Sequence, residues 1–372
     1  MSKNECCLET ESRDGEGGQL MPLPILVPSM MLITIMIILA VGGNLLVIIS
    51  YIKDKKLHNA HNLYIFHLAI TDFLLGLISM PFYAVYTALV WSWPFGKVFC
   101  KIYMVCDFTL CLQSVLLIII ISWDRLILVK SGAQYYMKES QNVARIKVAM
   151  SWTFAFLLYG PAIIGYDYWV GHSLVEEGDC DVEFFADFGF TLASSLIEFV
   201  VPFTSIAFIN TLVYLQIRKR QRIREGSTIK PKPQSKWAAD NSDKETNNGT
   251  NITTVTTISG NNHQICTYGN KKNTNFNKEH KSHKDLKAAK ALSILVIALA
   301  VCWIPYTVST IVIAFSPNSI DEDFYEILNW LLWFKASINP FLYAFNSDRF
   351  RENFVKILPL LRYVLKIKKR VY

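Results

Sequence analysis

Four ionisable side chains lie inside long apolar stretches of the sequence: Asp72, Asp107, Glu198 and Lys335. An ionised group at the centre of a bilayer costs about 2.5–3.5 kcal/mol on insertion scales, so each of them needs a functional explanation. In a low-dielectric cavity, a carboxylate can pair strongly with a protonated amine. The acids therefore predict a binding site for a cation.

A further charge marks the opposite end of the segment that contains Asp107. Asp107 and Arg125 are separated by about five helical turns, or about 27 Å, so they share one face of a helix at its two ends. Asp124 directly precedes Arg125. One end can meet a ligand outside the cell and the other a partner inside it. The alternative is that both residues are only interfacial charges.

Seven membrane-spanning helices are needed to position these residues. Of the 372 residues, 52% are hydrophobic and 18% are charged, and many apolar runs have no polar face of the kind that a soluble helix has. A helical span takes about 20 mostly apolar residues. Backbone groups in lipid must be bonded internally, so we expect an all-α, integral membrane bundle of seven helices. The spans are residues 25–52, 63–90, 98–128, 147–166, 187–216, 286–315 and 324–345.

The distribution of charge predicts the orientation of the bundle. Lys and Arg gather in 53–56, 218–224 and 349–370, whereas the loop 167–187 has many acids and no Lys or Arg. The N-terminus is therefore expected outside the cell and the C-terminus in the cytoplasm, in a multi-pass protein of the plasma membrane. The net charge of +7 reflects this topology and does not indicate nucleic-acid binding.

The remaining segments are two tails and one long loop. Residues 223–282 are rich in Asn, Lys, Thr and Ser, which predicts a disordered third cytoplasmic loop. Residues 348–358 place Phe350, Phe354 and Ile357 on one face, which predicts a short amphipathic helix along the inner surface. The expected layout is an extracellular N-terminus at 1–24, the bundle at 25–345, and the amphipathic helix with a basic tail at 346–372.

The cysteines on the outer side predict one disulfide. Cys100 begins the third span and Cys180 lies in the loop after the fourth, so both face the oxidising side of the membrane. Joining them would fix this loop over the mouth of the bundle. Cys6 and Cys7 are also outside and stay unassigned.

The chain resembles the rhodopsin-like G-protein-coupled receptors over nearly its full length, apart from the tails and the long loop. Any single matching motif is weak, but the ordered set is specific. The motifs are Gly43-Asn44, Leu68-Ala69-Ile70-Thr71-Asp72, Cys100, Asp124-Arg125, Trp152, Pro202, Cys302-Trp303-Ile304-Pro305 and Asn339-Pro340-Phe341-Leu342-Tyr343.

The resemblance implies a pocket for an amine. Asp107 occupies the position where receptors for biogenic amines bind the ligand ammonium, and Trp303, Tyr306 and Trp333 resemble the aromatic cage around such a cation. The alternative for these aromatics alone is ordinary helix packing. The ligand-binding set that we predict is Asp107, Cys111, Phe184, Phe185, Ser194, Ser195, Glu198, Trp303, Tyr306, Trp330 and Trp333.

Glu198 narrows the range of amines that the resemblance predicts as ligands. An acid one turn before Pro202 resembles the third and fourth histamine receptor subtypes, as do Phe184-Phe185 after Cys180 and the run around Trp330. Histamine has an ammonium at one end and an imidazole N–H at the other, which suits two carboxylates. Ser194 and Ser195 leave open a ligand with hydroxyls, and Glu198 could instead be a buried acid paired with a neighbouring donor.

The same resemblance implies how the signal crosses the membrane. Asp124 and Arg125 keep the family motif, Arg125 would pair with Asp285 at the inner end of the sixth helix, and release of that pair would let the helix swing outward. Asn339, Pro340 and Tyr343 belong to the same activation set. Two departures from the family pattern are Leu126, in place of a tyrosine after the Asp-Arg pair, and Asn210, where many relatives have a tyrosine.

Lys335 is the third departure. Receptors of this family have Asn or a similar residue at this position, near Asp72 and Ser114, where a sodium ion binds. We predict that the Lys335 ammonium replaces sodium by an ion pair with Asp72, the alternative being a lysine that extends to the surface. An opsin-like retinal site is disfavoured, because Trp333 occupies the position of the opsin lysine.

The predicted function is that of a receptor, not an enzyme, for a biogenic amine, most similar to histamine receptors of the third or fourth subtype. Its partners would be the lipid bilayer, a heterotrimeric G protein of the inhibitory class, a receptor kinase and arrestin, with no cofactor, metal or nucleic acid. The alternatives are a receptor for a catecholamine, an indoleamine, a trace amine or acetylcholine, and more remotely an ion-coupled transporter that uses Asp72 and Lys335.

Overall fold

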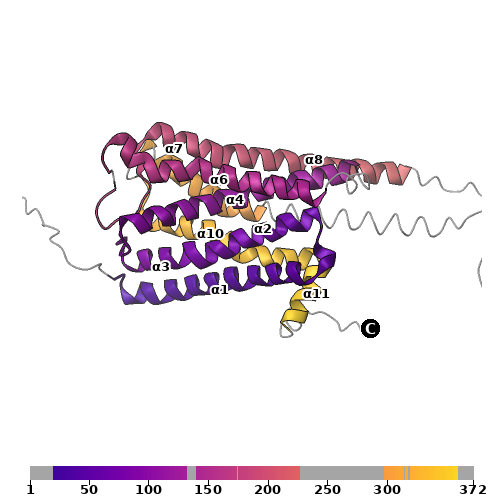
Figure 1. Cartoon of the computed structure of the whole chain (residues 1–372), viewed down its shortest axis with the longest axis horizontal. Coiled ribbons are helices and arrows are strands. Elements are labelled where there is room, and N and C mark those ends of the chain that lie inside the picture. Colours follow the sequence, from indigo (N-terminus) through magenta and orange to yellow (C-terminus); the bar gives the residue numbers. More distant parts are fainter. Residues whose placement is uncertain are drawn as a thin grey trace, which may run out of the picture.

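The structure is a bundle of long helices that lie side by side (Figure 1). It is a computed structural model that describes residues 20–131, 140–173, 175–226, 297–313, 315–316 and 319–358. These residues form helices, turns and loops and no strand, as an all-α fold requires.

Nine labelled α-helices and one further apolar helix make up the bundle. The labelled helices are α1 (Leu23–Lys53), α2 (Ala60–Leu74), α3 (Met80–Ala88), α4 (Gly96–Ser131), α6 (Gln141–Val170), α7 (Phe188–Ser195), α8 (Val201–Gly226), α10 (Glu322–Asn346) and α11 (Asp348–Ile357). Shorter helical segments are η1 (Lys55–Leu57), η2 (Leu75–Ser79), η3 (Glu183–Ala186) and η4 (Leu196–Val200). The further helix covers Ile297–Ile313.

The predicted seven-helix membrane bundle is confirmed. Within the described part of the chain, five helices are long and apolar enough to cross a bilayer: Leu23–Lys53, Ala60–Ala88, Gly96–Ser131, Gln141–Val170 and Phe188–Arg220. The second of these joins α2, η2 and α3, and the fifth joins α7, η4 and α8. The apolar helix Ile297–Ile313 and α10 complete the seven.

Polar side chains fix where five of the described helices begin. Each accepts a hydrogen bond from a backbone N–H of the first turn, which satisfies a group that the helix itself leaves unbonded. These residues are Asn59 for α2, Ser140 for α6, Asp187 for α7, Asp321 for α10 and Ser347 for α11. At its other end α6 stops at Gly171, whose φ of 86° lies in the left-handed region that glycine tolerates.

Two of the spans contain a π-helical turn just before or around a proline. Segment η2 precedes Pro81, and segment η4 precedes Pro202 and includes Glu198. A proline cannot donate a backbone hydrogen bond within a helix, which favours a local rearrangement of the bonding ladder. Such π-turns often occur at functional sites, and here one of them positions a carboxylate.

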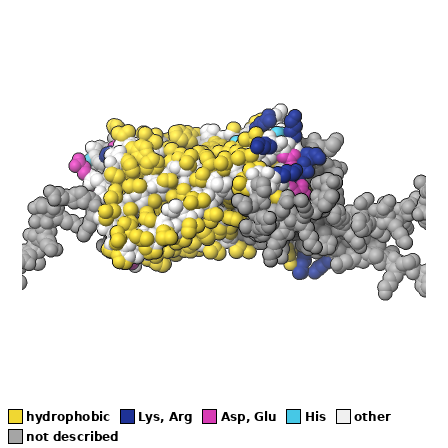
Figure 2. Space-filling model, turned by 90° about the horizontal axis from the view of Figure 1, so that it is seen from below, with side chains coloured by type: hydrophobic (Ala, Val, Ile, Leu, Met, Phe, Trp, Pro, Cys, Tyr) yellow, Lys and Arg dark blue, Asp and Glu magenta, His cyan; other side chains and the backbone are white. Residues whose placement is uncertain are grey.

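The outside of the bundle is apolar along its middle, and its charges gather at the ends (Figure 2). We name the two ends after α1: the Leu23 end, where α1 begins, and the Lys53 end, where it finishes. On α1 the side chains of Leu32, Ile35 and Ile38 are exposed, whereas Met36 and Ala40 are buried against the bundle. The exposed apolar surface is what a lipid environment covers.

Helix α4 is the central element, in contact with α2, α6 and α8, while α1 packs against α2 and α10. One contact between α1 and α10 is especially close. A Cβ atom added to Gly43 would lie 2.8 Å from Cγ of Pro340. Only glycine therefore allows α1 to approach α10 at this level.

The predicted amphipathic helix is present as α11, at the Lys53 end (Figure 1). Its Phe350 and Phe354 are buried. Asp54, just after α1, accepts hydrogen bonds from Arg349 Nε at 2.7 Å and Asn353 Nδ2 at 3.0 Å. The hydrogen bond from the Arg349 guanidinium holds the pKa of the Asp54 carboxyl well below its usual range. Helix α11 is thus attached by apolar contacts and by charge.

The helix boundaries differ from the prediction by a few residues, and most at the end of α8. Helix α8 continues to Gly226, so residues 223–226 belong to the helix and not to the long loop. The helix continues into the Arg- and Lys-rich sequence at its end, because helical hydrogen bonds do not require apolar side chains. The rest of the predicted loop lies outside the described residues, as do Asp285 at the predicted inner end of the sixth helix and residues 1–19.

Candidate ligand-binding site

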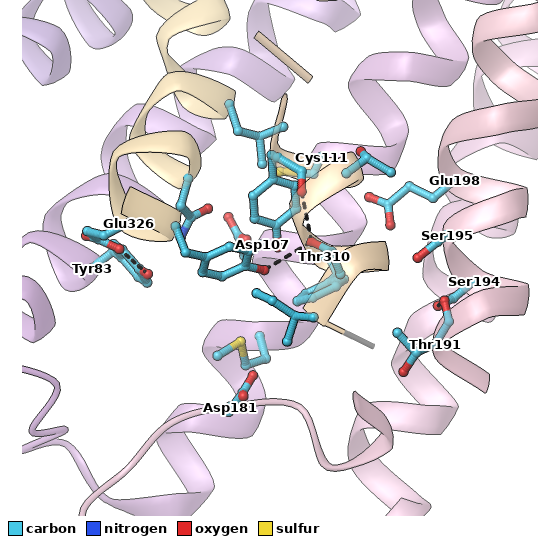
Figure 3. Close-up of a pocket in the computed structure, with 18 of the residues that line it drawn as sticks. Tyr83, Asp107, Cys111, Asp181, Thr191, Ser194, Ser195, Glu198, Thr310 and Glu326 are labelled. Carbon is cyan, nitrogen blue, oxygen red and sulfur yellow. Dashed lines mark hydrogen bonds between the residues drawn. The ribbon is translucent and has the colours of Figure 1, made fainter. Parts of the chain in front are cut away.

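A cavity of about 680 Å³ opens between the helices at the Leu23 end. Asp107 on α4 and Glu198 in η4 point toward the same space from different helices (Figure 3). Trp303 and Tyr306 come from the Ile297–Ile313 helix, and Trp333 comes from α10. The volume is of the size that small-molecule sites have.

Eight of the predicted ligand-binding residues line this cavity: Asp107, Cys111, Ser194, Ser195, Glu198, Trp303, Tyr306 and Trp333. The structure places two of the others elsewhere. Phe184 is fully buried and packs beside Phe108, Tyr159 and Phe190. Trp330 lies beside Trp333 and donates its indole N–H to Glu326. The side chain of Phe185 lies outside the described residues.

Asp107 has a carboxylate oxygen ready for a ligand. Its Oδ1 is buried and makes no hydrogen bond to the described residues. Ser79 and Trp333 are polar neighbours of this carboxylate. Buried polar atoms in folded proteins are nearly always bonded, so an oxygen without a partner inside a cavity indicates that the partner is a ligand or water.

Glu198 is held by a neighbouring donor. The hydroxyl of Tyr159, on α6, donates a hydrogen bond to Glu198 Oε2. Tyr159 is 1% exposed, and its ring lies 5.0 Å from that of Phe108 between centroids. The paired acid that the sequence left open as an alternative is therefore present, but the carboxylate also lines the cavity. Pairing and ligand access are both features of this residue.

Two serines, Ser194 and Ser195, lie near Glu198 in the cavity wall. Ser194, Ser195 and Glu198 lie along one helix (Figure 3). The Ser194 hydroxyl donates to the backbone oxygen of Thr191 at 3.0 Å. Its donor is therefore used within its own helix, which weakens it as a partner for a ligand acceptor.

Glu326 on α10 is a carboxylate of the cavity that sequence reasoning did not identify as a site residue. It accepts hydrogen bonds from the Tyr83 hydroxyl at 2.7 Å, the Thr87 hydroxyl at 2.6 Å and the Trp330 indole at 2.7 Å. No sequence signal could find it, because its donors lie on α3 as well as on α10. Three neutral donors around one buried acid make a rigid wall, as fully satisfied networks do.

The ionisable residues that line the cavity with a formal charge are all acidic among those described. Among the described residues that line it there are five acids and no Lys, Arg or His. Carboxylates in a low-dielectric cleft focus a negative potential, which draws in cations and repels anions. The acids are Asp107, Asp179, Asp181, Glu198 and Glu326.

The disulfide predicted between Cys100 and Cys180 is confirmed. It ties the loop after α6 to the beginning of α4. On either side of Cys180, Asp179 and Asp181 line the cavity, and Asp179 accepts a hydrogen bond from the Tyr86 hydroxyl. The bridge thus fixes acidic residues over the mouth of the cavity.

The predicted ion pair between Lys335 and Asp72 is wrong as a direct contact. Asn339 Nδ2 donates to Asp72 Oδ2 at 2.6 Å, while the Lys335 ammonium lies 5.5 Å from the centroid of the Trp303 ring and makes no hydrogen bond to the described residues. The π-face of a tryptophan attracts a cation, which accounts for this position. The two charges still interact at longer range.

Lys335 is 2% exposed, so the alternative of a lysine that extends to the surface is also wrong. Ser114 and Asp72 are fully buried at the same level of the bundle. Asp72 Oδ1 makes no hydrogen bond to the described residues. The centre of the bundle therefore encloses one ammonium and one carboxylate without direct contact.

At the Lys53 end, Asp124 and Arg125 meet a residue that the sequence did not reveal. His61, in the first turn of α2, contacts both of them. Asp285, the predicted partner of Arg125, lies outside the described residues. Farther along α10, Tyr343 is buried and Pro340 packs against Gly43.

The other two departures are explained by their neighbours. Leu126 is 2% exposed and belongs to an apolar cluster with Ile209 and Val213 of α8. Asn210 donates to the Ser122 hydroxyl at 3.3 Å and to the backbone oxygen of Ile206 at 2.8 Å. Both residues thus connect α4 to α8, one by apolar packing and the other by a hydrogen bond.

Comparison with known proteins agrees with this architecture. Residues 43–343 match the family described as "7 transmembrane receptor (rhodopsin family)". A histamine H4 receptor of Homo sapiens is 30% identical over 352 residues, which cover 85% of this chain and 87% of that protein. A histamine H4 receptor of Rattus norvegicus is 28% identical over 383 residues, covering 93% of this chain and 95% of that protein. The chain therefore belongs to the rhodopsin family of seven-transmembrane receptors, as its ordered motifs predicted.

Proposed function

We propose that this chain is a receptor for histamine, which it binds between Asp107 and Glu198, and that it transmits this binding to a heterotrimeric G protein. The observation that carries the proposal is the pair of carboxylates in one cavity that has no basic side chain among its described lining residues. The ammonium of the ligand would pair with Asp107, and the imidazole N–H would donate to Glu198. Charge-assisted hydrogen bonds of this kind are about twice as strong as neutral ones.

The relatives support the same ligand. Histamine H4 receptors from human, mouse and rat are 28–30% identical to this chain over at least 85% of its length. The aromatic side chains of Trp303, Tyr306 and Trp333 beside the acids supply the faces that a bound ammonium prefers.

The orientation follows from the positions of the charges. We propose that the Leu23 end faces the outside of a cell at the plasma membrane and that the Lys53 end faces the cytoplasm, because Lys and Arg favour the cytoplasmic side. Amines would then enter through the acidic mouth. A G protein of the inhibitory class, a receptor kinase and arrestin would bind at the Lys53 end.

The buried lysine supports a second element of the proposal. We propose that Lys335 acts as an internal cation beside Asp72 and takes the place of a sodium ion. The direct contact is absent, but a full positive charge is enclosed at this level with 2% exposure and interacts with Asp72 at longer range. This charge would repel a second cation that approached Asp72.

The test of the ligand is equilibrium binding of radiolabelled histamine to membranes from cells that express the wild type or one of three variants. Asp107→Asn is expected to lower affinity by about 30-fold or more, the usual effect of removing one partner of a desolvated charge pair. Glu198→Gln is expected to lower it about tenfold, the effect of losing a hydrogen bond to a charge. Ser194→Ala is the matched control, because its hydroxyl is bonded within its own helix.

The outcomes separate the alternatives. Loss of affinity in both acid variants, with Ser194→Ala unchanged, supports recognition of histamine by two carboxylates. If only Asp107→Asn matters, the protein is an amine receptor and the histamine assignment fails. If a catecholamine displaces the label more strongly than histamine and Ser194→Ala weakens it, the second end of the ligand is a hydroxyl.

A further inference from the structure

His61 occupies a position between the two charges at the Lys53 end of α4. It lies in the first turn of α2, which Asn59 caps by accepting a hydrogen bond from the backbone N–H of Asn62. The His61 side chain is 18% exposed, and Asp124 beside it is 3% exposed. The imidazole is therefore largely enclosed between α2 and α4.

Each ring nitrogen of His61 has its own partner. Nδ1 lies 3.0 Å from Asp124 Oδ2, and Nε2 contacts the guanidinium of Arg125. The two partners are neighbours in sequence but present opposite charges. The imidazole thus connects an anion to a cation.

The chemistry of the partners fixes the proton on the ring. A guanidinium has only donors, so Nε2 must accept from Arg125. A neutral imidazole that accepts at Nε2 carries its hydrogen on Nδ1. That hydrogen points at a carboxylate, which accepts it. One neutral tautomer therefore satisfies both contacts at once.

We infer that His61 is a positioning residue of signal transmission. Its imidazole links the Asp124 carboxylate to Arg125 through its two ring nitrogens, and it holds the Arg125 guanidinium against α2 in the resting receptor. This inference rests on the proposed coupling to a G protein. Activation must break the contact between His61 and Arg125, because the guanidinium cannot remain on Nε2 and also reach into a cavity that opens among the cytoplasmic ends of the helices. Asp124 alone does not define the position of Arg125.

The experiment measures nucleotide exchange on a purified inhibitory G protein by membranes with equal amounts of surface receptor, with and without histamine. His61→Ala removes both contacts and is expected to raise basal exchange about tenfold, the factor for one lost hydrogen bond to a charged group. His61→Asn keeps a donor at the position of Nδ1 but has no acceptor at that of Nε2, so it is expected to behave like His61→Ala. His67→Gln is the matched control, because His67 is a histidine of the same helix that packs against Phe66.

A double variant tests whether the effect passes through Asp124. In an Asp124→Asn background, His61→Ala is expected to add less than about twofold to basal exchange, because the two changes interrupt one chain of contacts. A purely structural role of His61 would instead lower surface expression and histamine affinity in every variant without raising basal exchange.

The results distinguish this inference from the proposed ligand. A wild type that responds to histamine, with basal exchange equal in all His61 variants, would overturn the role of His61 and keep the ligand. A wild type that is silent with histamine, with basal exchange still raised in His61→Ala, would overturn the ligand and keep the role of His61. If histamine has no effect on the wild type and basal exchange is equal in all His61 variants, both the ligand and the role of His61 are overturned.

Discussion

Replacing Lys335 by asparagine is expected to make agonist binding sensitive to sodium, whereas the wild type is expected to be insensitive. In the wild type an ammonium is enclosed at the level of Asp72, with 2% of its residue surface exposed. Asp72 has one oxygen without a hydrogen bond to the described residues. Removal of the ammonium leaves that carboxylate without a nearby cation, and a sodium ion can then take its place.

The size of the effect follows from the repulsion between two cations. A sodium ion on the open oxygen of Asp72 would lie close to the buried Lys335 ammonium. At a separation of about 4 Å and an effective dielectric constant of about 20, the repulsion is about 4 kcal/mol. This weakens sodium binding in the wild type by a factor of roughly a thousand. In Lys335→Asn the repulsion is absent, and agonist affinity falls about tenfold once sodium reaches ten times its own dissociation constant.

The assay is a histamine displacement curve in sodium chloride and in potassium chloride at the same ionic strength, so that screening by salt is equal in both. Lys97→Asn serves as the control, since Lys97 is an exposed lysine, with 52% of its side chain accessible, on the same protein. The reasoning is refuted if wild-type affinity falls with sodium as steeply as that of Lys335→Asn, or if neither protein responds.

Two other substitutions test contacts between helices. Tyr159→Phe is expected to lower histamine affinity about tenfold, because Glu198 loses the hydroxyl that holds it in the cavity; an amine without a second donor should bind as before, and equal losses for both ligands would contradict the assignment. Gly43→Ala is expected to lower the melting temperature of the detergent-solubilised receptor, since overpacking costs about 1–3 kcal/mol and the new Cβ would lie 2.8 Å from Pro340. Gly42→Ala, which meets nothing within 4 Å, should leave the melting temperature unchanged, and a shift of equal size in both variants would sink the packing argument.

The fold could be predicted well because the membrane leaves few choices. Apolar runs of sufficient length must be helices in lipid, and the charge pattern around them predicted which ends belong together. The disulfide between Cys100 and Cys180 was predictable for the same reason, since topology placed both cysteines on one side. The boundary at Gly226 was less predictable, because a helix can continue into charged sequence.

Contacts between side chains from different helices were harder to predict. The spacing of Lys335 and Asn339 placed them on one face of α10, but it could not predict that Asn339 bonds Asp72 while Lys335 turns toward Trp303. The direction of a long side chain depends on every neighbour around it. For the same reason Tyr159, on another helix, could not be identified as the donor to Glu198.

The neutral residues around a charge were missed more often than the charges themselves. Asp124 and Arg125 were predicted from their place at the end of a span, but His61 lies in a segment with ordinary polar composition. The hydroxyls of Tyr83 and Thr87, which donate hydrogen bonds to Glu326 in the cavity wall, were likewise not predicted. Single-sequence patterns identify where charge is buried and do not identify what surrounds it.

The π-turn at Leu196–Val200 changes how positions along this span can be compared. A π-turn inserts one residue into a helix, which rotates everything after it by about 100° relative to everything before it. A helical wheel drawn through the whole span would therefore assign lipid-facing residues to the interior on one side of Glu198. A cysteine-labelling scan along this span should show two helical periodicities with a phase break at Leu196–Val200. A residue-by-residue transfer of roles from a receptor without this turn would be out of register by one position from there on.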